Sequence, residues 1–299
     1  MFKKYVVPKH QILCFQYAWK PAAHRSGGNT HVGILKCIQL CYLHVSMEML
    51  QHPGLAKPLF AGKNSHFFDA CLYSGMGSVF ADNQSRPYSA IAILGDYAVL
   101  GGQPSEALLA DISAMRSVAY LILVGPDHRW NELIETVYGN RAKPFTRYAL
   151  NKNEHGFNPT TLQNCIDSLQ PGFVLQPIEE ELYHRCLIES WSKDLVALYP
   201  TYDRYAEYGL GFCVLKDGAI VSGASSYYFY EKGIEIEVDT HPGYRKQGLA
   251  TACCARLILS CLQRGLFPSW DAHTTTSLHL ALKLGYHFSH AYTAYELNS

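Results

Sequence analysis

Residues 234–250 have the sequence Ile-Glu-Ile-Glu-Val-Asp-Thr-His-Pro-Gly-Tyr-Arg-Lys-Gln-Gly-Leu-Ala, and the expected fold follows from them. Three branched apolar residues alternate with three acids from Ile234 to Asp239. This alternation predicts a β-strand with one packed face and one carboxylate-lined face. Pro242 and Gly243 end the strand, and the apolar run 249–262, which lacks proline and glycine, predicts a helix.

A basic segment with small residues joins this strand to this helix. Arg245 and Lys246 supply positive charge, and Gly248 and Ala250 let phosphate oxygens approach the backbone. The first amides of a helix have no partner within the helix and lie at the positive end of its dipole. The segment therefore predicts a binding site for a diphosphate. The glycine patterns of P-loops and of dinucleotide-binding turns are absent from the sequence.

The pattern Arg-x-x-Gly-x-Ala, formed by Arg245, Gly248 and Ala250, resembles the pyrophosphate loop of the GNAT family of N-acetyltransferases, which bind coenzyme A. Four further segments, in matching order and spacing, resemble the subgroup typified by the zwittermicin A resistance acetyltransferase: 211–215, 220–226, 268–272 and 281–286. The resemblance covers roughly residues 47–297.

The order of elements predicts an α/β (α+β) protein with two domains. Residues 169–299 are expected to form a GNAT acetyltransferase fold with a mixed, centrally parallel sheet, because helices separate its later strands. Its strands are expected at 173–176, 211–216, 219–228, 234–239, 267–272 and 288–295. Asp217-Gly218 predicts a hairpin turn between the second and third of these.

Residues 47–168 are expected to form a mixed α/β companion domain, which a degenerate copy of the same fold would explain. Strands are predicted at 78–81, 89–94, 97–100 and 119–124, and helices at 105–115 and 128–138. The segment 148–172 is expected to be the junction. Residues 1–46 hold six Lys or Arg and no Asp or Glu, which favours an atypical N-terminal extension. A helical arm over 32–50 is the alternative.

Composition excludes several classes of function. A formal net charge of zero gives no electrostatic basis for binding nucleic acid or an anionic membrane. No run approaches the roughly eighteen apolar residues of a membrane span. Cys253, Cys254 and Cys261 lie in the apolar helix, where a thiol acts as a small hydrophobe. Reduced thiols and a cytoplasmic protein are therefore expected, and the scattered histidines predict no metal site.

The resemblance implies acetyl-CoA as co-substrate. In the family a bulge splays the strand before the loop from its neighbour, and the acyl-pantetheine arm enters the gap. The backbone of Val238 and Thr240 would hold the thioester end. The diphosphate of the cofactor would be bound by the loop and the first turn of the helix, which comprise Arg245, Lys246, Gln247, Gly248, Leu249, Ala250 and Thr251.

Acetyl transfer needs a base that keeps the attacking amine neutral. Glu237 is the first candidate and Glu235 the second, since neighbouring like charges raise a carboxylate pKa toward the working range. A solvated strand face without a role is the alternative. Ser225 and Tyr227, on the neighbouring strand, are candidates for binding the acceptor, although ordinary alternation of strand side chains is the commoner explanation for such residues.

Two positions depart from the family pattern. Thr274 stands where the family usually has asparagine; it would donate one hydrogen bond to the cofactor or cap its helix. Ala281 stands where a tyrosine usually protonates the departing thiolate, so solvent or another tyrosine must supply that proton.

The predicted function is N-acetyltransfer from acetyl-CoA to an amine of a small molecule, by direct attack on the thioester. The alternative is an acyl-CoA-binding sensor with little turnover, which the missing tyrosine would permit. A homodimer is left open.

Overall fold

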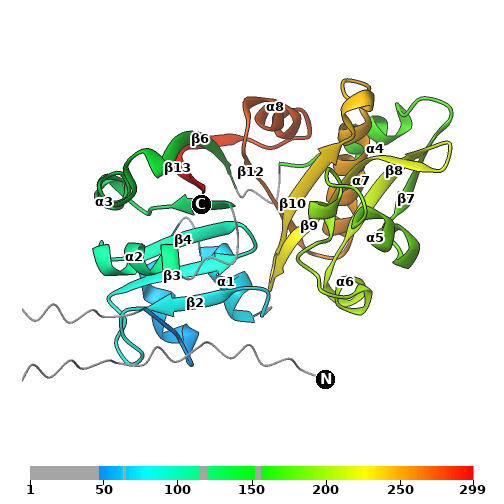
Figure 1. Cartoon of the computed structure of the whole chain (residues 1–299). Coiled ribbons are helices and arrows are strands. Elements are labelled where there is room, and N and C mark those ends of the chain that lie inside the picture. The colour runs from blue at the N-terminus through cyan, green and yellow to red at the C-terminus, as the bar shows by residue number, and fades with distance from the viewer. Residues whose placement is uncertain (1–46, 63–64, 74, 115–119, 152–155, 299) are drawn as a thin grey trace, which may run out of the picture. The chain divides into compact units, whose positions relative to one another are not determined.

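Two mixed β-sheets organise the residues that the computed structural model describes, which are 47–298 without 63–64, 74, 115–119 and 152–155 (Figure 1). The predicted extension 1–46 lies outside the described residues. Glu48–Met49 form strand β1, so the end of the alternative helical arm over 32–50 is not helical. The described residues belong to one compact unit.

The five-stranded sheet contains the acidic strand and has the order β11-β10-β9-β8-β7. Its strands are β7 (Phe173–Pro177), β8 (Gly211–Lys216), β9 (Ala219–Tyr230), β10 (Gly233–Thr240) and β11 (Phe267–Ser269). The hairpin predicted at Asp217-Gly218 joins β8 to β9, and both turn residues have positive φ. The parallel pair β10–β11 lies at one edge of this sheet.

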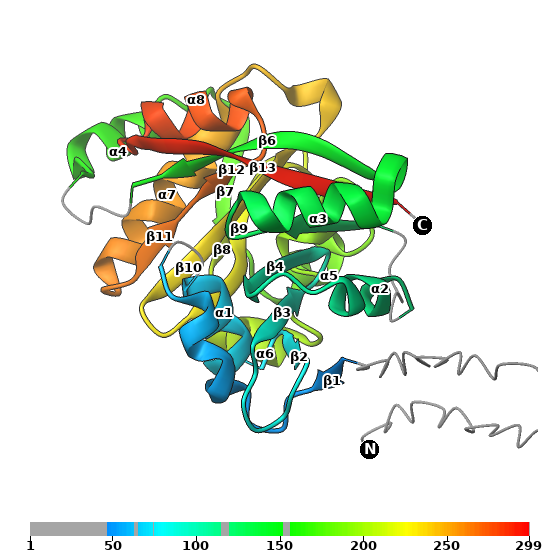
Figure 2. The ribbon, with the colours of Figure 1, turned by 90° about the vertical axis from the view of Figure 1, so that its left-hand side faces the viewer.

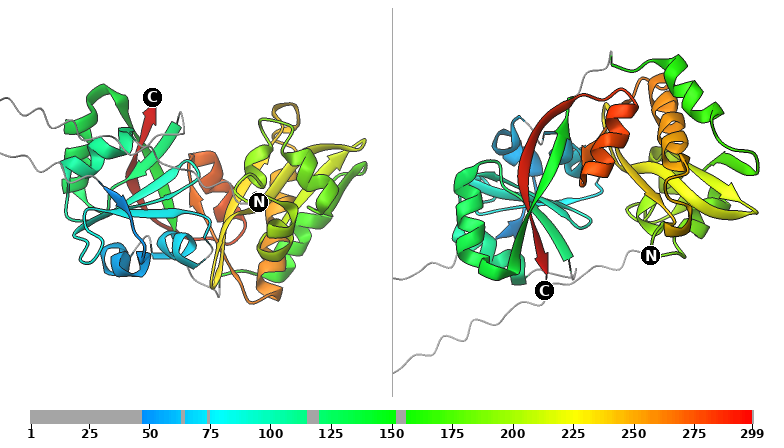
Figure 3. Two further views of the ribbon diagram at one scale, coloured as in Figure 1. Left: turned by 60° about the horizontal axis from the view of Figure 1, so that its bottom comes forward. Right: turned by 90° about the horizontal axis from the view of Figure 1, so that it is seen from above.

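Helix α7 (Leu249–Gln263) follows β10, as the apolar run predicted. It packs on the face of the five-stranded sheet that holds Ile234 and Ile236, and α4 (Pro159–Asp167) packs beside it (Figure 3). The opposite face is covered by α5 (Glu180–Cys186), the 3-10 turn η3 (Lys193–Leu195) and α6 (Tyr202–Tyr208). The apolar half of the β10 alternation therefore lies in the core, and the acidic half faces away from α7.

The eight-stranded sheet has the order β1-β2-β3-β4-β5-β13-β6-β12. Its further strands are β2 (Ser78–Ala81), β3 (Ser89–Leu94), β4 (Tyr97–Gly102), β5 (Tyr120–Val124), β6 (Ala142–Leu150), β12 (Asp271–Ala272) and β13 (Phe288–Asn298). Helices α2 (Glu106–Ala114) and α3 (His128–Tyr138) cover one face. Helix α1 (Ser65–Tyr73) and the 3-10 helix η1 (Pro53–Phe60) cover the other.

Elements predicted for the first half are confirmed at β2, β3, β4, β5, α2 and α3. The junction predicted at 148–172 overlaps β6, a strand for which the sequence analysis predicted nothing. Helices α1 and α6 were also missed. The exposure of β6 explains in part why the sequence did not predict it. Its side chains are mostly half-buried or exposed, so it lacks the apolar alternation that marked the other strands.

The strand predicted at 288–295 belongs to the eight-stranded sheet and not to the sheet of the acidic strand, which corrects the expected strand grouping. Strand β13 pairs antiparallel with both β5 and β6, and β6 and β13 run side by side in Figure 2. Strand β12 also pairs with β6. The predicted division at residue 168/169 is thus crossed by two strands, because alternation identifies a strand but not its partner.

Both sheets repeat one local order of elements. In the eight-stranded sheet β3 and β4 are antiparallel, α2 follows, and β5 lies parallel to β4. In the five-stranded sheet β9, β10, α7 and β11 have the same relation. This repetition supports the expectation of a degenerate copy. The two helices differ in their first turns. The first turn of α2 carries Glu106, which would repel a phosphate, whereas the first turn of α7 carries no acid.

Candidate active site

Strands β10 and β11 separate after a short parallel contact. They pair only from Gly233 to Glu235, opposite Phe267 to Ser269. Beyond this point β10 stays paired with β9 as far as Thr240. The segment after β11 instead crosses to the eight-stranded sheet, where it forms β12. We call the gap between residues 236–240 of β10 and strand β12 the fork. Its vertex lies at Glu235 and Ser269.

The peptide groups of Val238 and Thr240 are turned to the fork. The amide of His241 donates to the carbonyl of Val221 on β9, at 3.0 Å, so residue 241 faces β9. Successive peptide groups of a strand alternate between its two edges. Consistent with this, the carbonyl of Thr240 accepts from Nε of Arg245, at 3.2 Å, and not from β9. This is the orientation that the prediction for Val238 and Thr240 requires.

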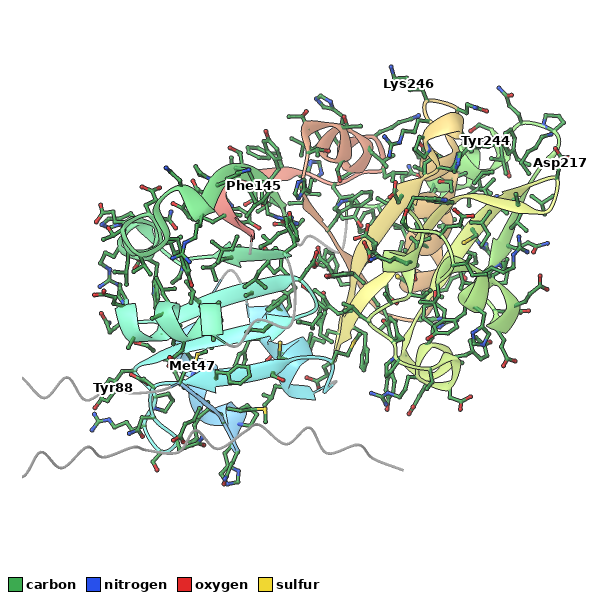
Figure 4. All side chains as sticks on the ribbon, viewed as in Figure 1. Met47, Tyr88, Phe145, Asp217, Tyr244 and Lys246 are labelled. Atoms are coloured by element: carbon green, nitrogen blue, oxygen red, sulfur yellow. The ribbon has the colours of Figure 1, made fainter. Side chains whose placement is uncertain are left out.

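The loop between β10 and α7 is exposed from Arg245 to Gly248, and Figure 4 shows Lys246 projecting outward from it. Lys246 and Gly248 have left-handed backbones, with φ of 62° and 79°. Gly248 is the N-cap of α7 and offers no side chain to cap its amides. A Cβ at Gly248 would meet nothing within 4 Å, so its surroundings are open. The loop therefore presents backbone amides and two cations to solvent.

The side chains of Leu249 and Thr251 are buried, and Gln247 is exposed. Contacts from Leu249 and Thr251 to a diphosphate would therefore have to come from their amides. The Arg245 guanidinium lies 3.8 Å from Asp239, and both side chains are well exposed. Exposed pairs of this kind contribute little stability, so Arg245 can turn toward an anion at small cost.

The bulge at the vertex lies on β9. Glu235 is opposite Tyr228 and Ile236 is opposite Ser226, which leaves Tyr227 as the extra residue. The resemblance had implied a bulge in β10 itself. Because β10 is regular, Glu235, Glu237 and Asp239 keep one common face, as the alternation predicted.

A cavity of about 620 Å³ opens at the vertex of the fork. Glu235, Ser269, Trp270 and Asp271 line it from the fork itself. Strand β9, the eight-stranded sheet, α1 and η1 supply most of the remaining walls. This volume lies within the usual range for small-molecule sites, roughly 300–1,000 Å³.

Glu235 lines this cavity, whereas Glu237 is not among its lining residues. Glu235 is 7% exposed, and its Oε2 lies 3.5 Å from Nε2 of His66 on α1. The hydroxyl of Tyr228 donates to the same oxygen at 3.4 Å. A carboxylate with two polar neighbours thus lies at the point where β10 and β11 separate.

Glu237 lies next to other acids. Burial and, after it, the charges of Asp194, Asp239 and Asp96 raise its pKa to about 8, whereas the hydrogen bond from the Val238 amide lowers it. Like-charged neighbours, the cause that the sequence predicted, therefore contribute to this shift, and burial is its first cause. A carboxyl group of this kind is mostly protonated at neutral pH, which suits an acid better than a base.

The sequence analysis missed a polar network on the cavity wall. Nε of Arg147, on β6, lies 2.7 Å from Oδ1 of Asp271, and the same oxygen accepts from the Tyr292 hydroxyl at 2.9 Å. The hydroxyls of Tyr292 and Tyr97 lie 3.0 Å apart. The eight-stranded sheet brings these groups together, because β12 and β13 both pair with β6.

The two predicted acceptor residues lie in different environments. Tyr227 lines the cavity, and its hydroxyl donates to Asp96 at 2.5 Å. Ser225 is fully buried and its hydroxyl lies 2.8 Å from that of Tyr205 on α6. Ser225 is therefore not placed to bind an acceptor in this cavity, because its side chain lies on the face of β9 that packs against α6.

Thr274 is the N-cap of α8 (Thr275–Lys283), and its hydroxyl accepts from the Ser277 amide at 3.1 Å. The capping alternative is therefore the observed role. Ala281 is fully buried in the core and has no proton to give. Four tyrosines line the cavity instead: Tyr97, Tyr227, Tyr228 and Tyr292. Burial raises the pKa of each, so their hydroxyls stay protonated at neutral pH.

In the part of the chain that the structure describes, no three His, Cys, Asp or Glu side chains gather to hold a metal ion. The described cysteines are free thiols. Among the same described residues, no helix combines the length and apolar character needed to cross a membrane.

Comparisons with known proteins agree with this geometry. A family model described as GNAT acetyltransferase matches residues 57–295. The uncharacterized N-acetyltransferase YdfB of Bacillus subtilis is 27% identical over 233 residues, which cover 73% of this chain and 85% of that protein. A solved GCN5-related N-acetyltransferase-like protein from Streptococcus suis is 45% identical, with a TM-score of 0.77, and the match covers 82% of this chain and 98% of that one.

A tandem GNAT protein from the clavulanic acid biosynthesis pathway is 10% identical, with a TM-score of 0.52 over 85% of this chain and 98% of that one, and shares the fold. The family model covers most of the chain, including the fork, the loop before α7 and most of the residues around the cavity. The chain therefore belongs to the GNAT acetyltransferase family, with the mixed α/β fold of that family and the activity class of an acyltransferase.

Proposed function

We propose that this enzyme moves an acetyl group from acetyl-CoA to an amine of a small molecule. One observation carries the proposal: the edge of β10 that β11 leaves unpaired runs from Glu235, which lines the cavity, to Thr240, and the loop after it leads to the N-terminus of α7. A long, thin co-substrate with an anionic end fits such a path, because its reactive end reaches the cavity while its phosphates stay at the loop.

In this proposal the acyl-pantetheine arm lies along the open edge of β10. The peptide groups of Val238 and Thr240 would hydrogen-bond to it as a neighbouring strand would. The diphosphate would accept hydrogen bonds from the amides of residues 247–251. Arg245 and Lys246 would add charge, and Thr274 would contribute from the N-terminus of α8.

Glu235 is the proposed base, because it lines the cavity at the vertex. The free amine attacks the thioester carbonyl carbon, a C–N bond forms, and the C–S bond breaks. Glu235 takes the proton that the nitrogen loses, directly or through a water molecule. The coenzyme A sulfur leaves as a thiolate and takes a proton from solvent or from one of the cavity tyrosines. General base catalysis of this kind contributes about 10²–10⁴-fold.

Glu237 was the first candidate from the sequence and remains the second candidate here. Its raised pKa leaves little carboxylate at neutral pH, and its like-charged neighbours lie away from the cavity lining. The matched variants Glu235→Gln and Glu237→Gln make the same substitution at two positions of one strand face, so they separate the two candidates.

The test is a thiol-release assay with acetyl-CoA and a panel of small amines, combined with calorimetry for acetyl-CoA binding. The expected result is release of coenzyme A with at least one amine, lost in Glu235→Gln while acetyl-CoA still binds. A loss confined to Glu237→Gln would reverse the assignment of the base. Failure of acetyl-CoA to bind the unmodified protein would overturn the proposed function.

A further inference from the structure

The cavity at the vertex of the fork points to a narrower class of acceptor. We propose that the acceptor is a primary amine on an aromatic body without a carboxylate, which is the class of the arylalkylamines. This inference rests on the proposed function, because it names the acceptor of the same site. Three features of the cavity wall carry it: two carboxylates, an occupied guanidinium and a cluster of aromatic rings.

The two carboxylates lie on either side of the vertex. Glu235 belongs to the β10 side and Asp271 to the β12 side, and both line the cavity. Asp271 is 26% exposed at its side chain, so it is open to the cavity in part. An amine reaches the site as an ammonium ion, which a carboxylate attracts. The Arg147 guanidinium offsets one of the two negative charges, and the net negative charge that remains repels a carboxylate placed next to the amine.

The guanidinium of Arg147 is already occupied. Nε and Nη2 donate to Asp271, at 2.7 Å to its carboxylate and 3.1 Å to its carbonyl. Nη1 lies 3.2 Å from Nδ1 of His273. A substrate carboxylate would have to displace an ion pair whose arginine is only 11% exposed. Arg147 is therefore a poor receptor for the carboxylate of an amino acid.

Aromatic rings gather beside Glu235. Phe67 lies edge-on to Tyr228, with ring centroids 5.6 Å apart, and 5.3 Å from the ring of Tyr97. All three line the cavity, and the Tyr228 hydroxyl contacts Glu235. A body attached to an amine at Glu235 would therefore lie against these rings. Aromatic faces favour aromatic or apolar groups, whereas a polyamine would place a second ammonium in an apolar wall.

The test compares kcat/KM for matched amines at saturating acetyl-CoA. Phenethylamine is the probe for the proposed class. Phenylalanine adds a carboxylate to this probe, and phenylalaninamide adds an uncharged carboxamide of similar size and shape. Spermidine replaces the aromatic ring with further amines. We expect kcat/KM for phenethylamine to exceed kcat/KM for phenylalanine and for spermidine by at least about tenfold. The value for phenylalaninamide should lie closer to that for phenethylamine.

A pair of adjacent variants controls for stability. Phe67 lines the cavity, whereas the equally buried Phe68 stacks on Phe60, 4.6 Å away, and does not line it. Phe67→Leu is expected to reduce the preference for phenethylamine over n-butylamine several-fold, and Phe68→Leu to leave it unchanged. Equal effects of the two variants would overturn the role of the ring cluster.

The outcomes separate this inference from the proposed function. Turnover of phenylalanine or spermidine at a rate equal to phenethylamine overturns the acceptor class and leaves acetyl transfer standing. If acetyl-CoA binds but no amine reacts, calorimetry with phenethylamine and coenzyme A decides, and absence of binding overturns the inference. Absence of acetyl-CoA binding overturns the proposed function itself.

Discussion

Asp271 on β12 and Arg147 on β6 form an ion pair of 2.7 Å across 124 positions of sequence. The pair lies on the cavity wall and joins the strand that leaves the fork to the eight-stranded sheet. It therefore fixes one side of the fork relative to the sheet that carries most of the cavity. Its arginine is nearly buried, which makes its energetics different from those of a surface pair.

A double-mutant cycle with Arg147→Met and Asp271→Leu measures this coupling. Each single variant leaves a charge without its partner and is expected to cost about 3–5 kcal/mol of the free energy of unfolding. The double variant should cost less than the sum, with a coupling of about 1–3 kcal/mol. The exposed pair Arg204–Glu207, at 3.5 Å, is the control and should couple by less than about 0.5 kcal/mol in urea unfolding. Additive costs at 147 and 271 would contradict this account.

Gly248→Ala tests the loop before α7. The left-handed φ of 79° costs an alanine about 1–2 kcal/mol, and the new methyl group lies where a phosphate would approach. We expect acetyl-CoA affinity to fall at least about tenfold, or about 1.4 kcal/mol, because the methyl group would keep phosphate oxygens away from the backbone amides.

Gly218→Ala is the matched control for this variant. Gly218 has φ of 80°, its Cβ position is equally open, and it lies in the β8–β9 turn. Both variants should lower the melting temperature by similar amounts. Only Gly248→Ala should weaken binding in calorimetry; an equal loss of affinity in Gly218→Ala would assign the effect to stability.

Glu237 predicts a dependence of stability on pH. Its pKa is raised in the folded protein from 4.5 to about 8, so the folded state holds a proton that the unfolded state has lost between these values. The resulting stability is present in full below the lower value and disappears as the pH rises through about 8. We expect the free energy of unfolding to fall from pH 6 to pH 9 by an amount on the order of a few kcal/mol, and the melting temperature to fall with it.

Glu237→Gln should remove this part of the pH dependence, since glutamine stays neutral throughout. The exposed Glu132 on α3 provides a comparison, and Glu132→Gln should leave the profile of the unmodified protein unchanged. Differential scanning calorimetry across this range is the measurement. Identical profiles for Glu237→Gln and the unmodified protein would show that Glu237 is already ionised in the fold.

Ser225→Ala separates structure from acceptor binding. The Ser225 hydroxyl lies 2.8 Å from the buried Tyr205 hydroxyl, which loses this hydrogen-bond partner in the variant. The expected cost is about 1–3 kcal/mol of the free energy of unfolding. The KM for the acceptor should not change, because Ser225 does not line the cavity. The double variant Ser225→Ala/Tyr205→Phe should recover part of the stability. A raised KM with unchanged stability would return Ser225 to the acceptor site.

Local chemistry determined what the sequence could predict. The alternation from Ile234 to Asp239, the break at Pro242 and the apolar run after Gly248 predicted β10, the loop and α7, and all three are observed. These elements depend on neighbours within a few residues. The same locality made the geometry of the proposed cofactor loop predictable, because a strand, a glycine with positive φ and a helix N-terminus follow one another directly in the chain.

Tertiary structure alone decided the cavity that we propose as the acceptor end of the site. Strand β13 pairs with β5 and β6, and β12 pairs with β6, so residues of both halves line one cavity. Neither the Arg147–Asp271 pair nor the contact of His66 with Glu235 has a signature in sequence spacing. The physical reason is that strand pairing depends on which edge is free in the folded protein, and alternation within a strand carries no information about that edge.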